Sequence, residues 1–254
     1  MVRLERKGHV GIIVLNRPEQ LNTFNTAMAQ DLNSALDELE KDDEIRVVVV
    51  KGAGKAFSAG IDINELEGKT PLEYYRWVRL MEKMCLTIAE MGKPVIASVQ
   101  DLAVANGLGL VAAADLAVAA EGARFGATAV NVGLFCMGPA VPLFRHLGKK
   151  KTLELVLTGD LIDAAEAQRL GLVNKVVPKE KLEEETMQLA EKIAAKSPLA
   201  VQLGKRSFYE MADLPYGKAI EATNNHFALL CTTEDAHEGV KAFSEKRAPH
   251  WKMR

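Results

Sequence analysis

Apolar residues form short blocks along the chain before Lys179, and most blocks end at a glycine or another turn residue. Residues 2–15 alternate on both sides of Lys7-Gly8, which predicts a hairpin. The run 95–99 predicts a buried strand, and the run of four valines at 47–50 predicts a strand covered on both faces, as in parallel sheets. Two shorter strands are expected at 116–119 and 175–177.

Helical spacing of apolar residues accounts for much of the remaining chain. We expect Thr26 to cap a first helix, a helix to resume near Asp62, and Pro71 to begin a helix that ends near Glu90. Further helices are expected at 110–114, 139–147, 150–157, 164–170, 180–196, 199–212, 216–232 and 235–247. Strands followed only by helices predict an α/β core over residues 1–195 and a helical region over 196–254.

Two strand–turn–helix segments carry the candidate chemistry. Glycine-bearing turns follow the strands at 47–50 and 95–99, at residues 51–60 and 105–109. A turn that opens a helix leaves backbone N–H groups without acceptors, and such groups attract an anion or a developing oxyanion. Two such turns on neighbouring strands would present two donors to one atom.

Composition narrows the function classes. The 254 residues carry a net charge of −2, so nothing indicates a nucleic-acid partner or an anionic membrane surface. Three cysteines without metal spacing, an N-terminus that does not resemble a targeting peptide, and no apolar run of about 20 residues predict a cytoplasmic protein. We expect no metal site and no phosphate-binding P-loop.

Several short motifs, taken in order, resemble the crotonase superfamily, the enoyl-CoA hydratase/isomerase fold, over essentially the whole chain. Within that superfamily the chain looks most like the branch of enoyl-CoA-hydratase-domain-containing proteins. The motifs are Asn16–Asn22 (NRPEQLN), Lys55–Ile63 (KAFSAGIDI), Lys93–Ala97 (KPVIA), Ala112–Asp115 (AAAD), Phe125-Gly126, Leu157–Asp160 (LTGD), 164–173 and Phe243–Arg247 (FSEKR).

The resemblance implies an α/β spiral of ββα turns with a C-terminal helical region that forms a homotrimer or a dimer of trimers. It implies an acyl-CoA thioester as ligand, with coenzyme A as part of the substrate and no permanently bound cofactor. The thioester oxygen would be held by the backbone N–H groups of Ile61 and Asn106, an arrangement that stabilises an enolate. Asn106 is unusual, because relatives place Gly or Ala there; it is either a plain turn residue or a side chain that enters the pocket.

The resemblance also assigns residues to the bound ligand. The body of coenzyme A would lie along the loops at 17–22 and 58–62, and two C-terminal positions would reach the nucleotide, in some relatives from a neighbouring subunit. The expected binding residues are Arg17, Leu21, Ser58, Gly60, Asp62, Asn131, Phe135, Cys136, Phe243 and Lys246. Cys136 is either a reactive thiol near a helix start or, as we expect, an inert packed one.

The chain departs from the family pattern at the two positions that carry out hydration. Hydratases activate water with two glutamates, and the corresponding positions here are Gly109 and Ala129. Between Asp115 and Asp160 the only acids are Glu121 and Glu154, neither of them near the pocket, so no relocated carboxylate is expected.

Three functions remain open from the sequence. The first is a lyase or isomerase of the enoyl-CoA hydratase/isomerase type, or a decarboxylase or thioesterase on the same fold, that stabilises an acyl-CoA enolate. The second is an acyl-CoA-binding protein with weak or no chemistry. The third is a structural oligomer without affinity for coenzyme A. Turnover of an acyl-CoA panel separates the first from the second, and a ligand-induced rise in melting temperature separates both from the third.

Overall fold

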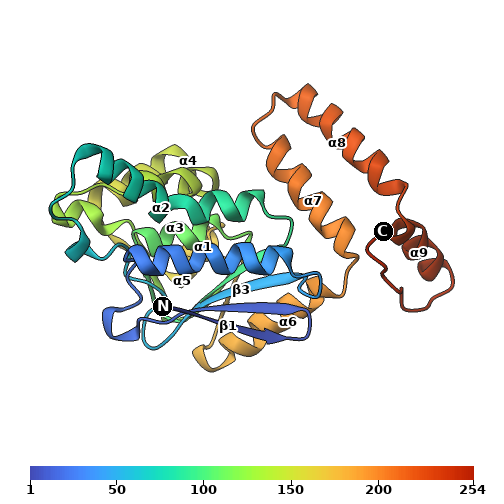
Figure 1. Ribbon diagram of the computed structural model, residues 1–254, viewed down its shortest axis with the longest axis horizontal. Coiled ribbons are helices and arrows are strands. Elements are labelled where there is room, and N and C mark those ends of the chain that lie inside the picture. Colours follow the sequence, from blue (N-terminus) through green and yellow to red (C-terminus); the bar gives the residue numbers. More distant parts are fainter.

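A six-stranded sheet forms the centre of the protein in the computed structural model, which describes residues 1–254 (Figure 1). Its strand order is β1-β2-β3-β4-β6-β9. The hairpin β1–β2 is antiparallel and every other neighbouring pair is parallel. The strands are β1 (Val2–Lys7), β2 (Val10–Leu15), β3 (Val47–Gly52), β4 (Val95–Val99), β6 (Leu116–Ala120) and β9 (Lys175–Val177).

A smaller sheet follows the order β5-β7-β8, with β5 (Leu102–Val104), β7 (Arg124–Gly126) and β8 (Leu161–Asp163). Its first strand lies directly before the turn at Ala105, so this sheet positions the second of the two glycine-bearing turns. Ser58 forms a parallel bridge with Ala103 of β5, which ties the first turn to the same sheet.

Helices supply the remaining regular structure. The α-helices are α1 (Thr26–Lys41), α2 (Pro71–Glu90), α3 (Asn106–Ala113), α4 (Met137–Thr158), α5 (Ala164–Arg169), α6 (Leu182–Ala194), α7 (Pro198–Met211), α8 (Tyr216–Cys231) and α9 (Glu234–Ser244). Short 3-10 helices are η1 (Pro18–Gln20), η2 (Ile63–Glu65), η3 (Thr128–Val132) and η4 (Lys179–Lys181). None of the helices is both long enough and apolar enough to cross a lipid bilayer.

Apolar side chains cover both faces of the large sheet. On one face, α1, α2 and α3 contribute to the main core, with residues such as Leu36, Met84 and Leu108 fully buried. On the other face, α6 packs on strand residues of which Val49 and Ile96 are examples. This confirms the expectation that β3 is covered on both sides, since its residues alternate between the two cores.

Most predicted elements are present, with four differences. The helix expected at 110–114 begins at Asn106, so most of the predicted turn at 105–109 is helical. Asn25, not Thr26, caps α1, because its side chain accepts the N–H of Met28 at 2.8 Å. The helix expected near Asp62 is only the three-residue η2; the long helix begins at Pro71, after Gly68 takes a left-handed φ of 77°. The three short strands of the small sheet, β5, β7 and β8, were not predicted.

The last three helices project from the body of the molecule, and α7 and α8 run antiparallel to each other (Figure 1, orange to red). A buried ion pair anchors α7: the ammonium of Lys205 lies 2.7 Å from the carboxylate of Asp115. The predicted boundary at 195/196 falls between α6 and α7. That residues 196–254 serve oligomerisation stays a prediction.

Candidate active site

The two glycine-bearing turns meet at Gly60 and Asn106. Gly60 has a φ of 89°, and a Cβ built on it would lie 3.4 Å from the backbone nitrogen of Asn106 and 2.7 Å from the Cβ of Ala105. Only glycine permits both this backbone conformation and this approach. The β3 and β4–β5 segments therefore bring residues 60–61 and 105–106 together, although more than 40 positions separate them in the sequence.

The N–H groups of Ile61 and Asn106 donate to no acceptor within the protein. Phe24 forms hydrogen bonds with the residues on either side of Ile61. Its N–H donates to Gly60 O at 2.8 Å, and its carbonyl oxygen accepts the N–H of Asp62 at 2.9 Å. These bonds leave the N–H of Ile61 without an acceptor. Asn106 is the first residue of α3, where no intrahelical acceptor exists. Two unused donors thus remain on adjoining turns.

Ala105 turns the chain so that α3 begins at this point. Its φ of 47° and ψ of −119° lie outside the regions that L-residues favour, a conformation that costs about 1–3 kcal/mol. Its N–H donates to Gly126 O at 2.9 Å, so the small sheet holds the strained residue in place.

Ser58 supports the first turn from inside. Its side chain is fully buried; the Oγ donates to Asn22 O at 2.8 Å and accepts the N–H of Gly60 at 3.2 Å. Because it is buried beneath the turn and both hydrogen bonds are internal, Ser58 holds the turn rather than facing a ligand directly.

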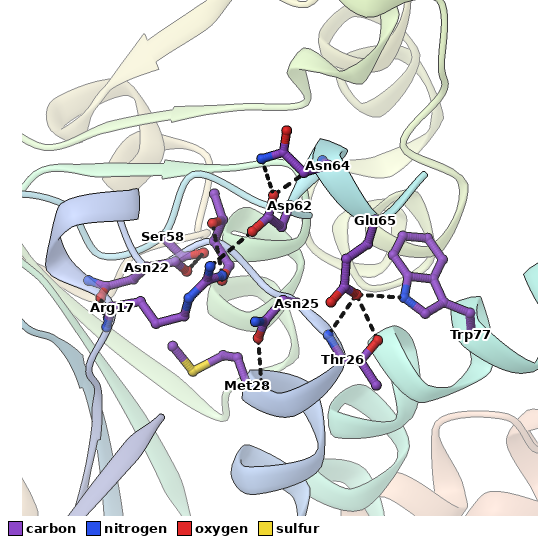
Figure 2. A network of polar contacts seen from close by, with 11 residues as sticks. Arg17, Asn22, Asn25, Thr26, Met28, Ser58, Asp62, Asn64, Glu65 and Trp77 are labelled. Atoms are coloured by element: carbon purple, nitrogen blue, oxygen red, sulfur yellow. Dashed lines mark hydrogen bonds and ion pairs between the residues drawn. The ribbon is translucent and has the colours of Figure 1, made fainter. Parts of the chain in front are cut away.

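Arg17 and Asp62 join the two loops assigned to coenzyme A (Figure 2). The Arg17 guanidinium lies 3.0 Å from the Asp62 carboxylate and donates to Thr23 O at 2.7 Å. Burial of Asp62 opposes ionisation, but Arg17 and the backbone and side chain of Asn64 outweigh it and lower the pKa of Asp62. In the same loop Leu21 has a φ of 49° and is exposed.

Gly109 and Ala129, the positions of the hydratase glutamates in the resemblance, offer no carboxylate, and the first is also crowded by a neighbouring helix. A Cβ on Gly109 would lie 3.2–3.3 Å from three atoms of Pro139 in α4. Ala129 is partly buried against the main core.

A carboxylate nevertheless lies beside the second turn, and it comes from outside residues 115–160, where the sequence offered only Glu121 and Glu154. Glu82 of α2 accepts a hydrogen bond at 2.9 Å from the side-chain nitrogen of Asn106. Its second oxygen, Oε2, is buried and has no hydrogen-bond partner. Burial raises the pKa of Glu82, and the Asn106 amide opposes that rise only in part.

The chain makes room for this carboxyl group at a third helix. A Cβ built on Gly138, in the first turn of α4, would overlap the Glu82 carboxyl group. The Asn106 side chain therefore points to Glu82, rather than serving only as a turn residue. Sequence reasoning missed Glu82 because this residue precedes the segment 115–160, where a replacement carboxylate was expected to show. The available signal was an acidic residue on the apolar side of α2, four residues after Val78 and three before Cys85.

The remaining predicted residues fall into two groups. Cys136 is buried, and this burial raises the pKa of its thiol, while Asn131 and Phe135 on the segment before α4 are exposed. Phe243, near the end of α9, and Lys246, just after it, are exposed, and α9 lies far from α3 at the end of the projecting helices (Figure 1). Within one copy of the chain they do not meet the two turns.

Known proteins match this chain over almost its full length. The enoyl-CoA hydratase/isomerase family model matches residues 5–254. A putative enoyl-CoA hydratase of Thermus thermophilus is 40% identical over 254 residues, covering 99% of this chain and 100% of the relative. The human enoyl-CoA hydratase domain-containing protein 3, named as mitochondrial, is 38% identical over 240 residues, covering 94% of this chain and 79% of its own length.

Solved structures share the architecture. A crystal structure of an enoyl-CoA hydratase from Mycobacterium smegmatis has a TM-score of 0.95 at 38% identity, covering 98% of both chains. A crystal structure of human enoyl-CoA hydratase domain-containing protein 3 has a TM-score of 0.95 at 37% identity, covering 98% of this chain and 99% of that one. The predicted crotonase fold is confirmed, and the chain belongs to the enoyl-CoA hydratase/isomerase family.

Proposed function

We propose that this protein is an enzyme that binds an acyl-CoA thioester and stabilises its enolate with the N–H groups of Ile61 and Asn106. The observation that carries the proposal is the pair of unused backbone donors on adjoining turns. Fixed donors aimed at a developing oxyanion in a water-poor site need no reorganisation during the reaction, and removing one such donor costs about 3–4 kcal/mol in a comparable site.

The ligand would extend in two directions from these donors. We place the body of coenzyme A along the Arg17 and Asp62 loops, whose ion pair fixes them relative to the first turn. The acyl group would lie toward Val78, one helical turn before Glu82 on α2, and Phe135, which directly precedes Cys136; both are exposed apolar side chains.

Acetoacetyl-CoA tests the donor pair directly, because its enolate absorbs in the near ultraviolet and its keto form does not. Added protein is expected to increase the enolate band at a fixed pH, and the thioether butyl-CoA, which lacks the carbonyl group, is expected to bind more weakly than butyryl-CoA. Equal binding of thioether and thioester, with no enolate band, would contradict the proposal.

The reaction itself is tested by incubation with enoyl-, malonyl- and simple acyl-CoA thioesters, with products read by mass and by chromatography. Water addition, loss of carbon dioxide, release of free coenzyme A and double-bond migration each leave a different signature. Absence of any product, together with binding, would favour the acyl-CoA-binding alternative.

Oligomerisation and location are part of the proposal. Exposed aromatic residues on all three projecting helices, Phe208, Phe227 and Phe243, support association of α7–α9 with another copy, which would bring Phe243 and Lys246 toward a neighbouring site. Light scattering after size exclusion is expected to give a trimer or a dimer of trimers. A cytoplasmic location is supported by cysteine usage, whereas several relatives are named as mitochondrial, and imaging of the tagged protein distinguishes the two locations.

A further inference from the structure

Three helices converge on the carboxyl group of Glu82. It belongs to α2, accepts the side-chain N–H of Asn106 at the start of α3, and fills the space that Gly138 leaves free in α4. It has no cationic partner, and the titratable groups that face it are the thiols of Cys85 and Cys136, both of which feel its charge. A stabilising ion-pair role is therefore excluded for this residue.

The geometry points to Glu82 as the group that carries a proton to and from the α carbon of the bound thioester. This inference rests on the proposed function and deepens it. One residue, Asn106, supplies both a backbone donor for the thioester oxygen and the amide that holds Glu82. The α carbon is two bonds from that oxygen, so the same residue brings the oxyanion donor and the carboxyl group to one place.

The unpartnered Oε2 is the atom that would exchange the proton. In the forward step the Cα–H bond breaks and an O–H bond forms on Glu82, while the electron pair moves into a Cα=C bond and the carbonyl oxygen becomes the enolate anion. Reversal returns a proton to carbon. Burial raises the pKa of Glu82, which favours its return of a proton to carbon.

A single carboxyl group also limits the reaction class. Adding water across a double bond requires one group to activate water and another to protonate carbon, and positions 109 and 129 supply neither. A carboxyl group that removes a proton from carbon and returns it at the same or a conjugated carbon needs no second acid. The substrates that fit are acyl thioesters with an acidic α hydrogen, and the reactions are proton exchange or double-bond migration on one face of the enolate.

The experiment is exchange of the α hydrogens of butyryl-CoA in deuterium oxide, read by mass, alongside calorimetric binding of the same thioester. We expect the unaltered protein to incorporate deuterium, and Glu82→Gln to bind equally well but to exchange at least about 100-fold more slowly. Glutamine retains an oxygen that accepts the Asn106 N–H, so a purely positioning role would survive this substitution. Glu90→Gln, at the exposed end of the same helix, is the matched control and should exchange like the unaltered protein.

The results of these measurements distinguish failure of the Glu82 role from failure of the proposed function. Exchange by Glu82→Gln at the unaltered rate, or binding without exchange by the unaltered protein, overturns the role of Glu82 and leaves enolate stabilisation to the acetoacetyl-CoA test. If the unaltered protein binds no acyl-CoA at all, the proposed function is contradicted, and so is the role of Glu82 that rests on it. Glu82→Asp, which keeps a carboxyl group on a shorter side chain, should retain a slower, pH-dependent exchange that glutamine does not show.

Discussion

Pro139 lies where a side chain on Gly109 would project: a Cβ there would be 3.2–3.3 Å from the Cα, Cβ and Cγ of Pro139. By the resemblance to hydratases, position 109 corresponds to one of their two glutamates. Here the acid is absent and Pro139 of α4 crowds the position. A side chain at position 109 would therefore require Pro139 to shift by a few tenths of an ångström.

The Gly109–Pro139 contact predicts that Gly109→Ala destabilises the protein, whereas helix propensity alone would predict that it stabilises the protein. Gly to Ala inside a helix ordinarily stabilises by about 0.5–1 kcal/mol. Gly109→Ala is instead expected to lower the free energy of unfolding, because crowding in a filled core costs about 1–3 kcal/mol. Urea denaturation at one protein concentration measures it. Gly204→Ala in α7, where nothing lies within 4 Å of the new Cβ, is the control and should stabilise.

Ser58→Ala should destabilise the protein by about 1–3 kcal/mol, since it leaves the Gly60 N–H buried without an acceptor and Asn22 O without a donor. The same loss loosens the turn that carries the Ile61 N–H. We therefore expect weaker enolate absorbance with acetoacetyl-CoA at saturating ligand. An unchanged enolate band in a destabilised variant would show that the turn keeps its geometry without Ser58.

The sheet was predictable because its signal is local. Four valines in a row at 47–50 have no polar face to expose, and the structure places them between two cores. The strands β5, β7 and β8 have three residues each and are held by pairing with one another, so no local pattern marks any of them. The Asp62 side chain binds Arg17 and the N–H of Asn64, and it caps only the single turn η2. A capping residue alone therefore does not indicate how long the following helix is.

The site was predictable only in part for the same reason. The turns at Gly60 and Asn106 follow strands, and adjacent parallel strands place such turns at one edge of the sheet. Glu82 comes from a different layer, and its approach to Asn106 depends on how α2 packs on α3. The residues near Glu82 in the sequence do not indicate how α2 packs on α3. The only local sign was an acidic residue among the apolar residues of the helix.

Glu82 should make stability fall as pH rises. Its pKa in the folded protein is raised by burial, so the folded state holds the proton more tightly than the unfolded chain does. Stability is then lost between the unfolded pKa and the folded pKa, as the buried carboxylate charges. Glu82→Gln is expected to match the unaltered protein in melting temperature near pH 4 and to exceed it near pH 8. A difference that is constant across this range would contradict the raised pKa.

Gly138→Ala should displace the Glu82 carboxyl group without removing it. The new methyl group would overlap the carboxyl, and the end of a flexible side chain yields more readily than the backbone of α4. We expect the protein to fold and to bind butyryl-CoA, but to exchange its α hydrogens more slowly. Gly217→Ala, which meets nothing within 4 Å on α8, should leave exchange unchanged. Undiminished exchange in Gly138→Ala would place the proton-carrying group elsewhere.

Asn106→Ala separates the two roles of Asn106, because it keeps the backbone N–H and removes only the amide that holds Glu82. That amide stabilises the charged carboxylate and so lowers the pKa that burial raises. Without it the pKa of Glu82 rises further, and proton removal from carbon, which needs the carboxylate, begins at higher pH. The rate of α-hydrogen exchange plotted against pH should therefore shift upward along the pH axis, while the enolate band of bound acetoacetyl-CoA persists. A shift in the opposite direction would mean that the amide holds the carboxyl in its protonated form; an unshifted profile would mean that another group titrates.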